Sequence, residues 1–440
     1  MLENFVHSAW SMIPFGLMLL AIAVFPMKAE KFWEDNRNKL KVVLALSLPT
    51  MLCLLFGGMG HELYHQVVND YVPFIILLGA LFAITGGVHL EGDIEAKPWV
   101  NTLFLFVGWL LASVMGTTGA SMLLIRPLIA TNQQREHKVH TVLFFIALVA
   151  NCGGLLTPLG DPPLFMLFLR GVPFVWFMHL FPQWLLTGML LLLLYFVVDT
   201  YYYKREAHAA LHADASEVRP LRLLGGFNFV YLMGVVFAVA FLNPSYIPQM
   251  GAENANFGII YLREIVLIVL AFLSMITTDH VLRYDKNKFS WNPIMEVVIL
   301  FLGIFVTMTP VLAYLSSHAA EMGLKHAWQF YYTTGALSSF LDNTPTAVAF
   351  HSVALGLPTE QLTQYGGEML SGVPVILLKA IALGSVMFGA MTYIGNGPNF
   401  MVKAIAERRG VKMPSFFGYM WKFSLVVLLP IYILVQLIFL

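Results

Sequence analysis

Long apolar runs separated by short polar connections follow one another along the whole chain. A helix that crosses a bilayer needs about 20 mostly apolar residues. Runs of this kind lie near 9–27, 42–60, 71–88, 141–170, 175–199, 228–243, 261–279, 292–315, 373–407 and 417–440. The pattern predicts an all-α polytopic membrane protein with about ten spanning helices. No basic segment precedes the first run and no small-residue cleavage site follows it, so we expect it to be retained as a span.

Two further apolar stretches, 100–130 and 327–355, are interrupted at their centres. The sequence GTTG at 116–119 interrupts the first stretch, and DNTP at 342–345 interrupts the second. Glycine, proline and polar residues in the middle of an apolar run are typical of two half-helices that meet at a tip. We therefore expect two re-entrant hairpins, each of which returns to the side from which it starts.

Composition agrees with a membrane protein and narrows the function. Apolar residues make up 58% of the 440 residues and charged residues 11%, whereas soluble domains have about 45–50% and about 25%. The 25 basic and 25 acidic residues leave no net charge, which excludes a nucleic-acid-binding surface. Two cysteines cannot form a zinc or haem motif alone, so we expect no cofactor beyond Na⁺ or H⁺ as coupling ions.

Basic residues fall in five clusters, near 28–41, 135–138, 204–222, 283–288 and 408–412. If both hairpins return to their own side, every cluster lies on the cytoplasmic face, as the positive-inside rule requires. This topology places both termini outside, in a multi-pass protein of the cell (inner) membrane. The polar connection 201–227 is expected to be a cytoplasmic linker, and its histidines and carboxylates to form a solvated loop rather than a metal site.

An internal repeat appears when the sequence is shifted by 235 positions. IALVANCGGLLTPLGDPPLFM (146–166) then matches IALGSVMFGAMTYIGNGPNFM (381–401), with shared glycine, threonine and proline positions. Each segment follows one hairpin, and in the predicted topology the two cross in opposite directions. The sequence therefore predicts an inverted repeat, which is typical of secondary transporters. One half (1–200) holds hairpin 100–130 and broken helix 141–170, and the other (228–440) holds hairpin 327–355 and broken helix 373–407.

The breaks and the hairpin tips carry the candidate ion ligands. Lipid cannot satisfy the backbone groups of a helix that unwinds at mid-membrane, so we expect a bound ion there. The candidates are Thr117, Thr118, Ser121, Asn151, Thr157, Gly160, Asp161, Asp342, Asn343, Thr344, Thr346, Thr392, Gly395, Asn396 and Asn399. Oxygen ligands of this kind suit a small inorganic cation such as Na⁺.

Asp161 and Asp342 are the acidic residues among these candidates. A carboxylate at this depth costs at least about 2.5–3.5 kcal/mol unless it is paired or binds an ion. We expect both to bind Na⁺ or H⁺ in competition, which suffices for antiport. The alternative is that each one caps the half-helix that follows it.

The strings NCGGLLTPLGDPPLF and SSFLDNTPTAV resemble the signatures of the ion transporter superfamily, which includes sodium/proton antiporters, arsenite permeases, the P protein and citrate transporters. The nearest group is that of citrate transporters and sodium/proton antiporters. The resemblance implies a homodimer with an elevator mechanism. It also implies one Na⁺ site at Thr118, Ser121, Thr157, Gly160 and Asp161, and another at Asn343, Thr344, Thr392, Gly395 and Asn396. Leu164 replaces the asparagine of the signature, and Asn396 matches Asp161, so we expect the two sites to differ.

Three functions are consistent with these patterns. The first is Na⁺/H⁺ exchange at the two carboxylates. The second is Na⁺- or H⁺-coupled transport of citrate or another di- or tricarboxylate, which two buried carboxylates would repel unless a cation neutralised them. The third is an intramembrane zinc protease, because HELYH at 61–65 matches H-E-x-x-H. That motif falls in a predicted loop and lacks a third ligand, so we expect a transporter rather than an enzyme.

Overall fold

The computed structural model describes residues 8–216, 218–252 and 255–440, and helices dominate it. The helices of the first half are α2 (Ile13–Lys28), α3 (Glu30–Trp33), α4 (Asn36–Phe56), α5 (Gly60–Tyr64), α6 (Val72–Thr85), α7 (Pro98–Thr131), α8 (Val139–Leu148), α9 (Pro162–Leu169), α10 (Phe181–Tyr203) and α11 (His208–Ser216). Those of the second half are α12 (Asn228–Phe241), α13 (Phe257–Ile260), α14 (Leu262–Thr277), α15 (Asn292–Ser317), α16 (Ala327–Phe340), α17 (Asn343–Leu355), α18 (Thr359–Gln364), α19 (Val375–Phe388), α20 (Gly397–Arg408), α21 (Phe416–Tyr419) and α22 (Leu429–Phe439). The strands are β1 (His89–Asp93), β2 (Arg219–Leu224), β3 (Met369–Leu370) and β4 (Val373–Pro374).

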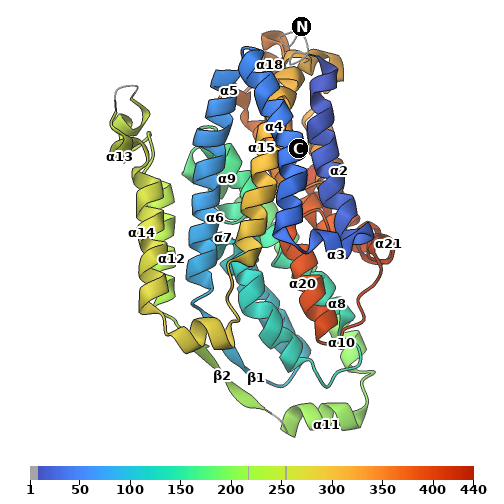
Figure 1. Cartoon of the computed structure of the whole chain (residues 1–440). Coiled ribbons are helices and arrows are strands. Elements are labelled where there is room, and N and C mark those ends of the chain that lie inside the picture. The colour runs from blue at the N-terminus through green and yellow to red at the C-terminus, as the bar shows by residue number, and fades with distance from the viewer. Residues whose placement is uncertain (1–7, 217, 253–254) are drawn as a thin grey trace.

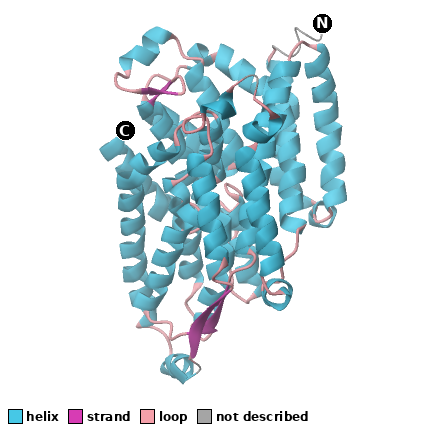
Figure 2. Cartoon of the chain, turned by 90° about the vertical axis from the view of Figure 1, so that its left-hand side faces the viewer, coloured by secondary structure: helices cyan, strands magenta, loops and turns pink. Residues whose placement is uncertain are grey.

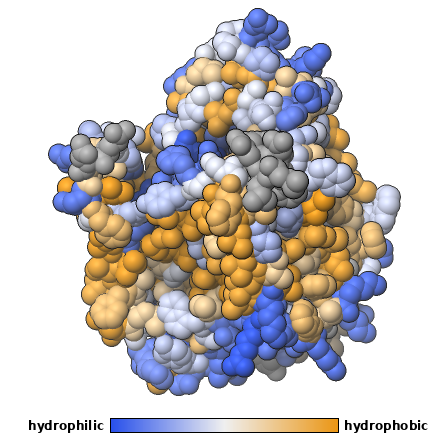
Figure 3. Space-filling model, turned by 45° about the horizontal axis from the view of Figure 1, so that its top comes forward, coloured by the Kyte–Doolittle hydropathy of each residue, from blue (hydrophilic) through white to orange (hydrophobic). Residues whose placement is uncertain are grey.

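Eight helical stretches within the described ranges are long and apolar enough to span a bilayer. Seven of them coincide with predicted runs, and the eighth is α7, the predicted first hairpin. The all-α polytopic membrane fold is thus confirmed. The predicted runs 228–243 and 261–279 form the shorter helices α12 and α14, of 14 and 16 residues. Figure 3 shows apolar residues covering the flank of the molecule, with hydrophilic residues gathered toward its ends.

The predicted first hairpin has the shape that its sequence indicates. At Gly116 the backbone takes φ 79° and ψ 151°, a conformation that glycine adopts readily. The chain reverses there, and the side-chain amides of Asn101 and Asn132, near the two ends of α7, exchange hydrogen bonds of 2.9 and 2.8 Å. In the second half, α16 and α17 pack against each other and join at Leu341–Asp342. Whether either hairpin re-enters the membrane stays a prediction.

The connection 201–227 contains helix α11 and strand β2, so the expected loop is wrong in its secondary structure, whereas most of its described side chains are exposed, as expected of a solvated segment. Strand β2 pairs antiparallel with β1, and α11 lies beside this ribbon at the lower end of the molecule (Figures 1 and 2). The ribbon forms because β1 lies between two spanning helices at the same end. Asp214 of α11 accepts a 2.7 Å hydrogen bond from the backbone N–H of Ala96. The division into repeat halves around this linker stays a prediction, as does its cytoplasmic location.

Glu206, just after α10, connects the linker to a neighbouring loop at the same end of the molecule as the ribbon. Its carboxylate accepts hydrogen bonds from the backbone N–H groups of Glu136 and His137, at 2.9 and 2.8 Å. Burial acts to raise the pKa of Glu206, but these two hydrogen bonds and the Arg135 charge hold it below its usual range. The linker is therefore tied to the loop that leads into α8.

The segment HELYH is helical, so the predicted loop at this place is wrong. It forms α5 and the start of a π-helix, η2 (His65–Tyr71), which continue into α6 as one span, Gly60–Thr85. The glycines before it end α4 but do not prevent a new helix from starting. His61, Glu62 and His65 are exposed, and no group of three metal-binding side chains occurs in the described part of the chain.

The start of α2 and the end of α22 both lie away from the β1–β2 ribbon (Figures 1 and 2). This arrangement is compatible with termini on one side of the membrane. Residues 1–7, which include the predicted outer N-terminus, lie outside the described residues. The side of the membrane on which the termini lie stays a prediction.

Candidate functional site

The two interrupted helices have the same local conformation. In the first, α8 is followed by the 3₁₀ turn η3 (Cys152–Leu156), an extended Thr157 and then α9; in the second, α19 is followed by η8 (Gly389–Met391), an extended Thr392 and then α20. Asp161 precedes α9 with φ −143° and ψ 141°, and Asn396 precedes α20 with φ −147° and ψ 139°. Asp161 and Asn396 are equivalent positions of the two repeat segments, which are 235 positions apart.

Each break is fastened to the hairpin that precedes it. The Thr157 hydroxyl donates to the Ser113 carbonyl, and the Thr392 hydroxyl donates to the Ser339 carbonyl. The Thr392 oxygen also accepts from the backbone N–H groups of Ile394 and Gly395, at 3.2 and 3.1 Å. A hydroxyl oxygen has two lone pairs, and both are occupied at Thr392. The two threonines therefore brace the breaks, and their predicted role as ion ligands stays a prediction.

Gly160 and Gly395 lie where two parts of the backbone approach so closely that a side chain would not fit. A Cβ atom at Gly160 would lie 2.0 Å from the Gly154 carbonyl oxygen, and one at Gly395 would lie 2.6 Å from that of Gly389. The Gly160 carbonyl accepts a 2.8 Å hydrogen bond from the N–H of Thr117 at the tip of α7. Glycine is needed here because the backbone on either side of each break folds onto itself.

Asp161 lies at the point where four segments meet, and its side chain is fully buried. One carboxylate oxygen accepts from the Thr117 hydroxyl (2.8 Å) and the Asn396 amide (3.1 Å), and the other accepts from the Asn343 amide (2.5 Å). The side chain makes no capping hydrogen bond to α9. All three donors are uncharged, and none of the ion pairs within the described ranges includes Asp161.

Three asparagines extend this network across both repeats. The Asn396 amide also donates to the Asn151 side-chain oxygen (3.2 Å), and the Asn151 amide donates to that of Asn399 (2.7 Å). Asn399 in turn donates to the carbonyls of Gly389 and Thr392. Asparagines of both repeats are thus connected by hydrogen bonds to Asp161 or to one another, and whether the repeats hold one ion site or two stays a prediction.

Unlike Asp161, Asp342 makes its hydrogen bond with the helix that follows it. Its carboxylate accepts a 3.0 Å hydrogen bond from the backbone N–H of Thr344, which makes it the N-cap of α17. The Thr346 hydroxyl donates to the Asp342 carbonyl, and the Thr344 hydroxyl lies 3.5 Å from the Asn343 side-chain oxygen. The capping alternative therefore describes Asp342, whereas it does not describe Asp161.

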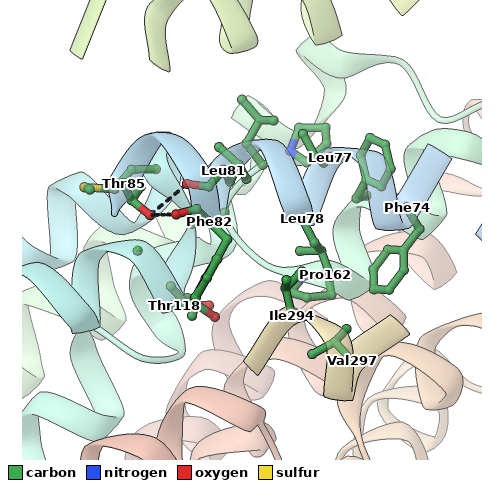
Figure 4. Close-up of a pocket in the computed structure, with 18 of the residues that line it drawn as sticks. Phe74, Leu77, Leu78, Leu81, Phe82, Thr85, Thr118, Pro162, Ile294 and Val297 are labelled. Carbon is green, nitrogen blue, oxygen red and sulfur yellow. Dashed lines mark hydrogen bonds between the residues drawn. The ribbon is translucent and has the colours of Figure 1, made fainter. Parts of the chain in front are cut away.

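Thr118 and Ser121 lie outside the hydrogen-bond network. Thr118 is exposed and lines a pocket of about 110 Å³ between α6, α15, the tip of α7 and residues 158–165. Figure 4 shows that most of the labelled lining side chains are apolar, among them Phe82, Leu78, Pro162 and Ile294. The Ser121 hydroxyl is fully buried and has no hydrogen-bond partner in the described structure.

Comparison with known families places the chain. Residues 5–440 match the model of a family described as "Putative citrate transport". The chain belongs to this citrate-transport family. Proteins named as uncharacterized transporters in Mycobacterium bovis and Mycobacterium tuberculosis are each 22% identical to it over 435 residues, which is 93% of this chain and 94% of each relative. The chain is thus a transporter and not an enzyme.

Some residues of this transporter that support the site were not found from the sequence. Ser113 and Ser339 each lie three positions before a hairpin tip, at Gly116 and Asp342, and this shared spacing could have revealed them. The buried Asp70 and the partly exposed Arg170 form an ion pair of 3.1 Å between different helices. Each is a charged residue at the end of an apolar run, but nothing in the sequence indicates that the two are partners.

Proposed function

We propose that this transporter exchanges Na⁺ for H⁺ at Asp161. The observation that supports it most is the environment of that carboxylate, which is fully buried and, within the described part of the chain, receives hydrogen bonds only from Thr117, Asn343 and Asn396. Neutral donors ease the burial of the negative charge but do not cancel it. A cation or a proton completes the site, and competition between the two for one carboxylate gives antiport.

The location of the donors explains how occupancy could be coupled to movement. Thr117 comes from the α7 tip, Asn343 from the start of α17, and Asn396 from the second break. A cation at Asp161 would therefore act on both hairpins and both broken helices at once. We propose that these elements move together against the remaining helices, as in an elevator, in a homodimer in the cell membrane.

The family description favours a second candidate, cation-coupled transport of citrate or a related carboxylate. The pocket beside Thr118 opens next to the Asp161 network and offers the substrate a place. Because Asp161 has no basic partner, an anionic substrate there would need an accompanying Na⁺ or H⁺ to offset the repulsion. The two candidates thus share Asp161 and differ in whether a carboxylate moves with the cation.

Proteoliposomes loaded with Na⁺ and a pH-sensitive dye separate the candidates. Outward movement of Na⁺ should acidify the interior without citrate, and Asp161→Asn should abolish the signal. Asp342→Asn is the matched control, because asparagine is as good an N-cap as aspartate. Proteoliposomes that contain this variant should acidify as those with the parent protein do. Acidification that requires citrate would favour cation-coupled transport of a carboxylate substrate. Undiminished exchange by the Asp161→Asn variant would exclude both candidate functions, because both use Asp161.

A further inference from the structure

The helix that begins at Asp161 ends at a second buried charge. Helix α9 has eight residues and is therefore about 12 Å long. Arg170 is its C-cap, and its guanidinium Nη2 lies 3.1 Å from Asp70 Oδ2 and 3.4 Å from Gln66 Oε1. Asp70 is 1% exposed and Gln66 5%. The ion site and this ion pair thus sit at opposite ends of one short rigid helix.

The ion pair joins two groups of elements. Asp70 and Gln66 belong to η2, which the Tyr71 hydroxyl attaches to α15 through the Val298 carbonyl (2.8 Å); α15 packs in turn on α2 and α4. On the other side, α9 packs along α17, whose first residue, Asn343, donates to Asp161. Helix α9 also contacts η2 and α6 (Figure 1).

Four buried nitrogen atoms in or near the ion pair have no hydrogen-bond partner within the described residues. They are Gln66 Nε2, Arg170 Nε and both ring nitrogens of His351, none of which has a hydrogen bond to the described residues. His351 lies on α17, is 1% exposed, and is close enough to Arg170 to be affected by its charge. Buried polar groups without partners are rare in a stable arrangement. A group of them at one contact indicates a contact that is satisfied differently in another state.

We propose that Asp70–Arg170 is a closing contact of the transporter, which opens in every transport cycle and exposes the buried Gln66, Asp70 and His351 to water. This inference rests on the proposed transport function. The pocket beside Thr118 is bounded by the same two groups, with α6 and α15 on one side and residues 116–119 and 158–165 on the other. Separation at Asp70–Arg170 would widen that pocket toward Asp161. Neither Asp70 nor Arg170 lines that pocket, so both are positioning residues.

Thiol labelling tests this without any transported substrate. The background is Cys53→Ala/Cys152→Ala, with Val297→Cys on the α15 wall of the pocket as the reporter. Asp70→Asn/Arg170→Gln removes both charges together, so that no buried charge is left unpaired. We expect the labelling rate of the reporter to rise by at least about fivefold, because the closed population falls. The charge-reversed pair Asp70→Arg/Arg170→Asp should return the rate to within about twofold of the parent.

The matched control is Lys403→Gln/Glu407→Gln, which removes an ion pair that lies within α20 alone; its labelling rate should not change. His351→Leu should act in the opposite direction and slow labelling, because leucine removes the unsatisfied nitrogens of the closed state. The proposal is overturned if the folded Asp70→Asn/Arg170→Gln protein labels at the parent rate. If that variant does not fold, unchanged or faster labelling of His351→Leu overturns it instead.

The result is independent of the ion assignment. Adding Asp161→Asn to the same background abolishes coupled transport if the proposed function holds, but it leaves the reporter's response to Asp70→Asn/Arg170→Gln in place. Loss of transport together with a normal labelling response supports both proposals. A normal labelling response with transport intact in Asp161→Asn contradicts the ion assignment alone.

Discussion

The two broken helices share their backbone but not their charge. At equivalent positions, Asp161 and Asn396 have nearly the same φ and ψ, and each precedes a proline-containing half-helix. In the first break the side chain is a carboxylate, and in the second it is an amide that donates to that carboxylate at 3.1 Å. Two carboxylates at this distance would repel each other in a buried place. A repeat that brings its two halves together can therefore keep one charge at the centre and use the other half to hold it.

The hairpin tips show the opposite distribution. The first tip has Gly116, with no charge, and the second has Asp342, which caps α17. Among the breaks and the tips, each half thus carries one acidic residue, Asp161 at the break in the first half and Asp342 at the tip in the second. Only Asp161 directs its carboxylate toward other segments, whereas Asp342 serves its own helix. We therefore expect Asp161, rather than Asp342, to be available to an ion.

The largest effect should come from moving the charge between the two breaks. Asp161→Asn should reduce coupled transport by at least about 100-fold, the size expected when a proton-carrying group is lost. Asp161→Asn/Asn396→Asp places a carboxylate in the other half, within the same network, and should restore a measurable part of the exchange. Dye-loaded proteoliposomes measure both. A double variant as inactive as Asp161→Asn would show that the two breaks are not interchangeable.

The next effect concerns pH. Asn396→Asp adds a second carboxylate about 3 Å from the first, and the pair cannot easily lose both protons. A higher pH is then needed before Na⁺ can replace the proton, so the pH of half-maximal exchange should rise by at least about one unit. The matched control is Asn399→Asp, which changes an asparagine of the network that does not contact Asp161. An unchanged pH profile in Asn396→Asp would place the titrating group elsewhere.

The sequence predicted the backbone of the site better than the roles of its side chains. Glycine and proline at matching positions indicated both breaks, because few other residues permit such a backbone. Asp161 was singled out by its depth in an apolar run. The roles of Thr157 and Thr392 were not predictable, because a hydroxyl that braces a carbonyl and one that binds an ion look alike in sequence. The Asp70–Arg170 pair depends on contacts between distant helices, which no local pattern specifies.

A smaller effect should distinguish the packing of the two breaks. Gly160→Ala would bring a Cβ within 2.0 Å of a carbonyl oxygen, whereas Gly395→Ala would bring it within 2.6 Å. We expect both to destabilise the protein, Gly160→Ala by about 3 kcal/mol or more and Gly395→Ala by about 1–2 kcal/mol, as overpacking does. Thermal unfolding in detergent measures this. Gly397→Ala is the control, since no atom lies within 4 Å of its Cβ position, and equal losses at Gly160 and Gly395 would contradict the difference in packing.

The smallest effect separates a brace from an ion ligand. Thr392→Val leaves the Ser339 carbonyl and the N–H groups of Ile394 and Gly395 without their partner, and Thr157→Val leaves the Ser113 carbonyl and the N–H of Leu159. We expect a loss of about 1–2 kcal/mol for Thr392→Val and somewhat less for Thr157→Val. The exposed Thr363→Val should change stability by less than about 0.5 kcal/mol.

Na⁺ distinguishes the two roles of Thr392 further. A ligand that binds the folded protein raises its melting temperature, so Na⁺ should stabilise the parent through Asp161. Because the lone pairs of Thr392 are already occupied, Thr392→Val should start from a lower melting temperature but gain as many degrees from Na⁺ as the parent does. Asp161→Asn should gain none. If Thr392→Val loses the gain as well, the Thr392 hydroxyl of the parent gives up its backbone partners to coordinate the ion. The second break would then share in binding the cation that we propose at Asp161 in the first.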